Sequence, residues 1–191
     1  MSKILISGYY GFANAGDEAM LTAIIESLRQ VEKNVELTVL SGNPEDTAAK
    51  HQVCSVYRFN PLGIIRAMKD SELIISGGGS LLQDVTSKRS LLYYLSIIGL
   101  GKFFGKKVML FAQGIGPIRA KWARKLTSLV CNEADLITVR DSESAAELIE
   151  MGVKPEKITV TADSVLSLNP VTKECGQYLL QEAGVDLTKP V

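Results

Sequence analysis

Short apolar runs rich in β-branched residues alternate along the chain with longer stretches in which apolar residues recur every three or four positions. The short runs predict strands over residues 3–7, 36–40, 53–57, 73–76, 107–111, 136–139 and 157–160. The longer stretches predict helices over residues 16–32, 61–70, 88–103, 119–132 and 142–151. This alternation is typical of an α/β domain. We therefore predict a doubly wound, mostly parallel, Rossmann-like sheet that binds ligands at the carboxyl ends of its strands.

The pattern changes after Asp163, where a break at Asn169-Pro170 precedes one more predicted helix over residues 172–184. The residues that follow this helix resemble the approach to another strand. We therefore expect two parts in the chain: a Rossmann-like domain over residues 1–170, and a linker helix with the start of a second domain over residues 171–191.

The 191 residues are 46% hydrophobic and 22% charged, and 21 lysines and arginines balance 21 aspartates and glutamates. This composition allows a real core, and the zero formal charge argues against a general nucleic-acid-binding protein. Three widely spaced cysteines argue against a disulfide scaffold or a zinc site, and we expect no metal and no cofactor. The single histidine, His51, lies in a polar stretch, so we interpret it as a solvated loop or helix-end residue.

Charge is distributed unevenly along the chain. Residues 85–132 contain nine lysines and arginines and no aspartate or glutamate. Such a segment predicts a basic face for peripheral contact with an anionic membrane surface, or for a phosphate-bearing substrate. The alternative is a crossover helix that packs against the sheet with its lysines in solvent. Residues 90–101 fall short of the roughly 20 residues that a bilayer span needs, so we expect a soluble, cytoplasmic protein.

A glycine-rich loop follows the first predicted strand, where a nucleotide-binding loop would lie. Its glycines, Gly8, Gly11 and Gly16, match neither a G-x-G-x-x-G motif nor a P-loop. Asp17 and Glu18 at the helix start already complement the helix dipole, which disfavours an anion and favours a hydroxyl-rich ligand such as a sugar. The alternative is a plain glycine turn with Asp17 as the helix cap.

Two further glycine-rich loops follow the fourth and fifth predicted strands. Glycines let a backbone approach a ligand closely, and an aspartate beside them is able to accept a hydroxyl hydrogen. A tight strand-to-helix turn explains each loop equally well, but three loops at equivalent strand ends together favour a ligand site. The residues concerned are Gly77, Gly78, Gly79 and Asp84 in one loop, and Gln113, Gly114 and Gly116 in the other.

Arg140 follows the sixth predicted strand, a position from which its guanidinium could hold a carboxylate or phosphate in bidentate fashion. The alternative is a salt bridge to Asp141 or Glu143. Ser142 is predicted to cap the next helix. Asp163 ends the seventh strand and is expected to face the same cleft.

Together these segments resemble the polysaccharide pyruvyltransferase family, and its bacterial cell-wall type in particular. The resemblance rests on five segments in the family's order: the opening Gly8-Tyr9-Tyr10-Gly11-Phe12-x-Asn14-x-Gly16-Asp17-Glu18, then Gly77-Gly78-Gly79-x-Leu81-x-x-Asp84, Ala112-Gln113-Gly114-Ile115-Gly116-Pro117, Val139-Arg140-Asp141 and Ala162-Asp163.

The resemblance implies the N-terminal domain of a GT-B-like two-domain enzyme with its site between the domains. Such an enzyme transfers a pyruvyl group from phosphoenolpyruvate to sugar hydroxyls as a ketal, and the acceptor is a lipid-linked saccharide at the cytoplasmic membrane face. By the same resemblance, Arg140 would lie in the phosphoenolpyruvate site as the catalytic residue. The expected substrate-binding residues are Gly11, Asn14, Gly16, Asp17, Gly77, Gly78, Gly79, Asp84, Gln113, Gly114 and Asp163.

The family's chain is longer, and its second domain supplies a histidine and further basic residues for the donor. We therefore expect this chain to hold the acceptor half of the enzyme and to be inactive alone. Two other functions stay open at this point: a GT-B glycosyltransferase that uses a nucleotide sugar, and a non-catalytic saccharide-binding module.

Overall fold

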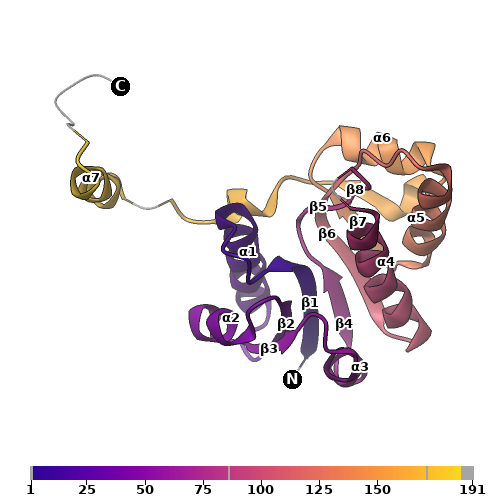
Figure 1. The fold of residues 1–191 in the computed structure, drawn as a ribbon, viewed down its shortest axis with the longest axis horizontal. Coiled ribbons are helices and arrows are strands. Elements are labelled where there is room, and N and C mark those ends of the chain that lie inside the picture. The colour runs from indigo at the N-terminus through magenta and orange to yellow at the C-terminus, as the bar shows by residue number, and fades with distance from the viewer. Residues whose placement is uncertain (1, 86, 171, 186–191) are drawn as a thin grey trace.

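The structure is a computed structural model that describes residues 2–85, 87–170 and 172–185. Its centre is a parallel sheet in the order β3-β2-β1-β4-β6-β7-β8, with β5 paired to β6 beside this path (Figure 1). The strands are β1 (Lys3–Tyr10), β2 (Glu36–Ser41), β3 (Cys54–Tyr57), β4 (Leu73–Ser76), β5 (Gly79–Leu82), β6 (Lys107–Ile115), β7 (Leu136–Val139) and β8 (Ile158–Val160). The chain winds outward from β1 in one direction and then from β4 in the other, which confirms the doubly wound prediction.

Helices cover both faces of this sheet. They are α1 (Ala15–Val31), α2 (Pro44–His51), α3 (Pro61–Asp70), α4 (Lys88–Phe103), α5 (Lys121–Glu133) and α6 (Ser142–Glu150). Alternate residues of β1 face opposite sides: Ile4 and Ile6 join the cluster under α1, whereas Leu5 joins the cluster under α3 to α6. Burial on both faces explains why the strands read as continuous apolar runs in the sequence.

The structure differs from the predicted elements at several places. Helix α2 is not among the predicted helices, and Thr47 is its one buried residue. Strands β1 and β6 continue to Tyr10 and Ile115, so Gly8, Gln113 and Gly114 lie in strands and not in the loops expected there. Residues 79–82 form the short strand β5, whose Gly79 pairs with Gln113, instead of a turn that leads directly into a helix. The cap of α6 is Asp141 and not Ser142, because the Asp141 carboxylate accepts a 2.7 Å hydrogen bond from the amide of Ser144.

The last described helix, α7 (Lys173–Glu182), begins after the cap Thr172 and lies away from the sheet (Figure 1). None of its residues is buried. The predicted boundary after residue 170 stays a prediction, and the strand expected towards residue 191 falls outside the described residues.

The basic segment 85–132 contains α4, β6 and nearly all of α5. Helix α4 packs against the sheet through Leu91, Tyr94 and Ile98, as the crossover-helix alternative requires. Some of the cations of this segment are already paired: Lys102 and Lys107 bind Asp135, and Arg124 binds Glu147. Contact with a membrane surface stays a prediction. In the part of the chain that the structure describes, no helix has the length and apolarity to cross a bilayer.

Candidate functional site

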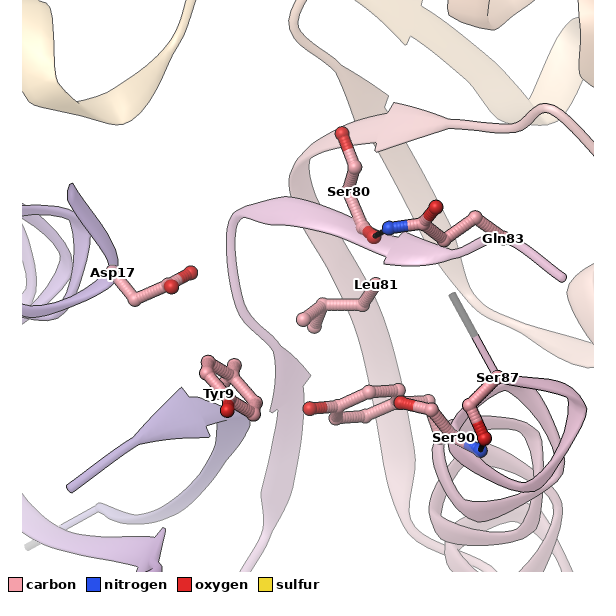
Figure 2. A pocket seen from close by; sticks show the side chains of 8 residues that line it. Tyr9, Asp17, Ser80, Leu81, Gln83, Ser87 and Ser90 are labelled. Carbon is pink, nitrogen blue, oxygen red and sulfur yellow. Dashed lines mark hydrogen bonds between the residues drawn. The ribbon is translucent and has the colours of Figure 1, made fainter. Parts of the chain in front are cut away.

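The candidate site lies at the carboxyl ends of β1, β5, β6 and β7, and contains two cavities. The main pocket has a volume of about 350 Å³ (Figure 2) and is lined by Tyr9, Asp17, Ser80, Leu81, Gln83, Ser87, Ser90 and Tyr94. The second cavity, of about 290 Å³, contains Arg140 and several residues of the loop after β6 and of α6. Ser80 lines both cavities, so the two adjoin. We call them the main pocket and the Arg140 cavity.

Asp17 projects into the main pocket because another residue caps its helix. The side-chain oxygen of Asn14 accepts hydrogen bonds from the amides of Gly16 and Asp17, at 3.0 and 3.3 Å. The interpretation of Asp17 as the cap is therefore wrong. Figure 2 shows its carboxylate facing Leu81 and Ser80 across the pocket. Burial, and secondarily the negative charge of Glu18, raise the pKa of Asp17.

Glu18, the neighbour of Asp17, holds the preceding loop. Its carboxylate accepts a 2.8 Å hydrogen bond from the amide of Gly11, a residue with a φ of +77° that favours glycine. The same carboxylate lies 3.4 Å from the ring of His51. His51 does end a helix, as predicted, but its side chain is only 9% exposed, so it is not solvated.

The three consecutive glycines allow close packing within the protein. A side chain on Gly77 would overlap the hydroxyl of Tyr10, and side chains on Gly78 and Gly79 would lie 3.1 and 3.2 Å from Met20 of α1. This packing brings Gly79 next to Asp17, whose carboxylate oxygen would be 3.3 Å from an added Cβ. The glycines therefore shape the wall of the pocket by bringing β5 against α1.

Two of the predicted site residues hold the loops around the pocket. The fully buried Gln113 donates its side-chain amide to the carbonyl oxygens of Ser76 and Gly77. Both oxygens of Asp84 accept 2.9 Å hydrogen bonds, from the amides of Arg119 and Ala120, and these bonds lower the pKa of Asp84. The structure therefore places both side chains in contact with backbone and not on the wall of the main pocket.

Arg140 is held in its cavity by three long contacts. Its guanidinium lies 3.4 Å from Asp141, 3.4 Å from Asp163 and 3.3 Å from the hydroxyl of Ser80. The predicted salt bridge to Asp141 therefore exists, and Asp163 shares the same cation, as expected from its strand-end position. The side chain is 34% exposed. A guanidinium held this loosely retains donors for an anion that enters the cavity.

Gly114 makes room for this guanidinium. A Cβ at that position would lie 2.8 Å from the Cζ and Nε atoms of Arg140 and 2.8 Å from the hydroxyl of Ser80. The predicted residue Gly114 thus acts through Arg140 and Ser80, the residues where the two cavities meet.

Sequence reasoning missed most of the wall of the main pocket. Tyr9 stands in the glycine-rich opening segment, and the hydroxyls of Ser87 and Ser90 come from the beginning of α4. A serine at a helix start is a weak signal, because most such serines only cap the helix. The beginning of α4 and the end of β1 come together only when the chain is folded.

The family model described as polysaccharide pyruvyl transferase matches residues 14–176. No curated protein matches. Among solved structures, HepE from Anabaena in complex with UDP and glucose has a TM-score of 0.60 and 12% identity, over 96% of this chain and 50% of that one.

A UDP-GlcNAc 2-epimerase from Neisseria meningitidis bound to UDP-GlcNAc has a TM-score of 0.60 and 13% identity, over 99% of this chain and 55% of that one. A glycosyltransferase from Rickettsia africae has a TM-score of 0.56 and 12% identity, over 99% of this chain and 51% of that one. The chain thus spans about half the length of these structures, and at such identities the likeness shows the fold alone: a Rossmann-like domain of the kind found in GT-B glycosyltransferases and epimerases. Because the family model covers most of the sequence, the chain belongs to the polysaccharide pyruvyl transferase family.

Proposed function

We propose that this domain is the acceptor-binding half of an enzyme that transfers a pyruvyl group from phosphoenolpyruvate to a sugar of a lipid-linked cell-wall saccharide, as a ketal. Family membership supports the reaction class. The observation that carries the assignment to this site is the adjacency of two chemically different cavities, a hydroxyl-rich pocket with one carboxylate and a cavity with an accessible guanidinium, which share Ser80.

The main pocket has the chemistry expected for a sugar. Its wall offers the carboxylate of Asp17, the hydroxyls of Ser80, Ser87 and Ser90, and the apolar surfaces of leucine and tyrosine side chains. A carboxylate accepts hydrogen bonds from sugar hydroxyls, while serine hydroxyls both donate and accept. Asp17 is therefore the group proposed to hold, and to take a proton from, the attacking hydroxyl.

The Arg140 cavity has the chemistry expected for the donor. Phosphoenolpyruvate carries a carboxylate and a phosphate, and a guanidinium fork binds either group in bidentate fashion. The contacts of Arg140 with Ser80, Asp141 and Asp163, at 3.3 to 3.4 Å, are long enough for a substrate anion to replace them.

The proposed reaction balances as follows. The methylene carbon of phosphoenolpyruvate gains a proton and becomes a methyl group, while a sugar hydroxyl oxygen bonds to the central carbon and loses its proton. The bond from that carbon to the phosphate oxygen then breaks, and phosphate leaves. A second sugar hydroxyl oxygen takes its place and gives up its proton, so that the two hydroxyl protons end on the methyl group and on phosphate. The resemblance assigns the proton donor for the methylene carbon to the second domain.

Turnover by the full-length enzyme tests this proposal. We expect phosphate release from phosphoenolpyruvate that depends on a saccharide acceptor, and a loss of at least about 100-fold in kcat/KM for Arg140→Gln, since a guanidinium clamp on a transferring anion contributes on that order. Lys154→Gln is the matched control, because it removes an exposed cation that lies outside both cavities and outside the basic segment 85–132. Transfer from a nucleotide sugar without use of phosphoenolpyruvate would overturn the proposal in favour of a glycosyltransferase.

A further inference from the structure

Arg58, the first residue after β3, is a buried cation that the proposed reaction does not use. Its side chain is 4% exposed. Among the described residues, no carboxylate forms an ion pair with it. Its Nη2 atom donates a 3.4 Å hydrogen bond to the hydroxyl of Tyr94, while Nε and Nη1 have no hydrogen-bond partner in the described part of the chain. An unneutralised buried charge is costly, so its presence calls for an explanation.

Aromatic rings surround this guanidinium. The shell, as we call it, consists of five rings whose centroids lie 4.4 to 5.9 Å from the Arg58 Cζ atom: Tyr9, Phe12, Phe59, Tyr93 and Tyr94. Such rings stabilise a cation electrostatically but leave its net charge in place. The site therefore keeps a full positive charge at the same end of the sheet as the main pocket. In the shell, Tyr9, Phe12 and Phe59 are 40 to 62% exposed, whereas Tyr94 is 2% exposed.

Two members of the shell also line the main pocket. Tyr9 and Tyr94 belong to both, so the pocket wall on that side is backed by Arg58. Because the Tyr94 oxygen accepts from Arg58, its own hydrogen is available for donation to a ligand oxygen. Burial raises the pKa of Tyr94, with Arg58 opposing, so the hydroxyl keeps that hydrogen at neutral pH.

The pocket is consequently polarised. Asp17 gives one wall a carboxylate, with Glu18 behind it, whereas the Tyr94 wall offers a hydrogen-bond donor strengthened by the charge of Arg58. A neutral sugar uses the Asp17 side alone. A sugar with an anionic substituent uses both sides, and the repulsion from Asp17 and Glu18 directs the anion to the Tyr94 wall.

We propose that Tyr94, with Arg58 behind it, is a subsite for a phosphoryl group attached to the saccharide in the main pocket. The proposal rests on the proposed function in taking a saccharide as the ligand of this pocket. Tyr94 contacts the phosphoryl oxygen, and Arg58 is a positioning residue that acts through the Tyr94 hydroxyl. The subsite selects a glycosyl phosphate over the same sugar without its phosphate.

NMR titration of this 191-residue chain tests the subsite with two probes, N-acetylglucosamine 1-phosphate and the methyl glycoside of N-acetylglucosamine. We expect the phosphate to tighten binding about tenfold or more, the usual value of one hydrogen bond to a charged group. Tyr94→Phe removes only the hydroxyl and should abolish this gain, so that the variant binds the two probes with equal affinity. The matched control is Tyr10→Phe, since the Tyr10 hydroxyl is buried without a partner in the described residues and does not line the pocket.

A second pair of variants tests the charge. Arg58→Met should lose the same gain, and Arg58→Lys should recover part of it; thermal denaturation checks that each variant is folded. A third probe, inorganic phosphate, should bind at least tenfold more weakly than the glycosyl phosphate.

The outcomes separate the two proposals. Equal affinity for both glycosides in the wild type, or a full gain in Tyr94→Phe, would overturn the subsite while leaving a saccharide pocket in place. Inorganic phosphate binding as tightly as the glycosyl phosphate would also overturn it. Binding of neither glycoside would remove the saccharide pocket itself.

Discussion

Gly114→Ala offers a sharp test of the role of Arg140, because it moves that guanidinium without touching its charge. The added Cβ would lie 2.8 Å from two guanidinium atoms, against 3.4 Å at the start of ordinary contact, so Arg140 must retreat by about 0.6 Å. Gly114 does not have a positive φ, so alanine fits the backbone there. The strain falls on the far end of the flexible Arg140 side chain and on the Ser80 hydroxyl, which also lies 2.8 Å from the added Cβ and has to rotate away.

The retreat has unequal effects on stability and on binding. The contacts of Arg140 with Ser80, Asp141 and Asp163 are already 3.3 to 3.4 Å long, so a shift of this size breaks them at a cost of about 1 kcal/mol or less in the free energy of unfolding. The alignment of a bidentate clamp is much more sensitive, since a displacement of about 1 Å can reduce rates 100-fold.

We therefore expect the kcat/KM of the full-length enzyme for phosphoenolpyruvate to fall between about 10-fold and 100-fold, with the denaturation midpoint nearly unchanged. Gly99→Ala is the matched control, because that glycine lies in α4 with nothing within 4 Å of an added Cβ. Wild-type kinetics for Gly114→Ala would refute the reasoning, since the clamp would then tolerate displacement.

Three further predictions concern other groups. Asp17→Asn should leave stability equal or higher, because burial disfavours this carboxylate, yet weaken saccharide binding about tenfold in an NMR titration; unchanged binding would remove Asp17 from the acceptor site. Burial alone would raise the pKa of Asp135, but hydrogen bonds from Lys102 and the Val108 amide outweigh it and lower that pKa to about 2. Because the pKa is lower in the folded chain than in the unfolded chain, the charged carboxylate stabilises the fold at neutral pH, and Asp135→Asn should cost about 1–2 kcal/mol in the free energy of unfolding at pH 7 and progressively less between about pH 4 and pH 2. Urea unfolding at several pH values measures this cost, and a cost that does not change with pH would contradict the linkage. If the basic segment contacts an anionic membrane, the double variant Lys121→Gln, Lys125→Gln should bind vesicles of anionic lipid more weakly, by about 1 kcal/mol of binding free energy per cation removed. Co-sedimentation with the vesicles measures this binding, and a wild-type chain that stays in the supernatant would contradict the contact.

The fold was predictable because the central strands are short buried runs and most crossover helices have one apolar face. Helix α2 was not among the predicted helices, and Thr47 is its one buried residue. The missed strand, β5, shows the limit of that reasoning. Its Gly79 has a φ of +91° and its pairing partner, Gln113, comes from a distant strand, so nothing local distinguishes residues 79–82 from a turn.

The candidate site was predictable to the extent that parallel strands bring their carboxyl ends to one edge. That rule placed Asp17, Arg140 and Asp163 correctly at the edge, and the structure brings Arg140 and Asp163 into contact. It could not show that Asp84 and Gln113 bind backbone, because their partners lie more than 30 residues away in the sequence. Sequence reasoning missed Arg58 for the same reason, because the aromatic rings around it come from three separate segments of the chain.

A crystal structure of this chain with a saccharide acceptor and phosphoenolpyruvate bound together is the most direct test of the two-cavity account. We expect a sugar hydroxyl within hydrogen-bond distance of Asp17, and carboxylate or phosphate oxygens of the donor on the guanidinium of Arg140, with Ser80 between them. A donor bound away from Arg140, or a sugar bound outside the main pocket, would contradict it.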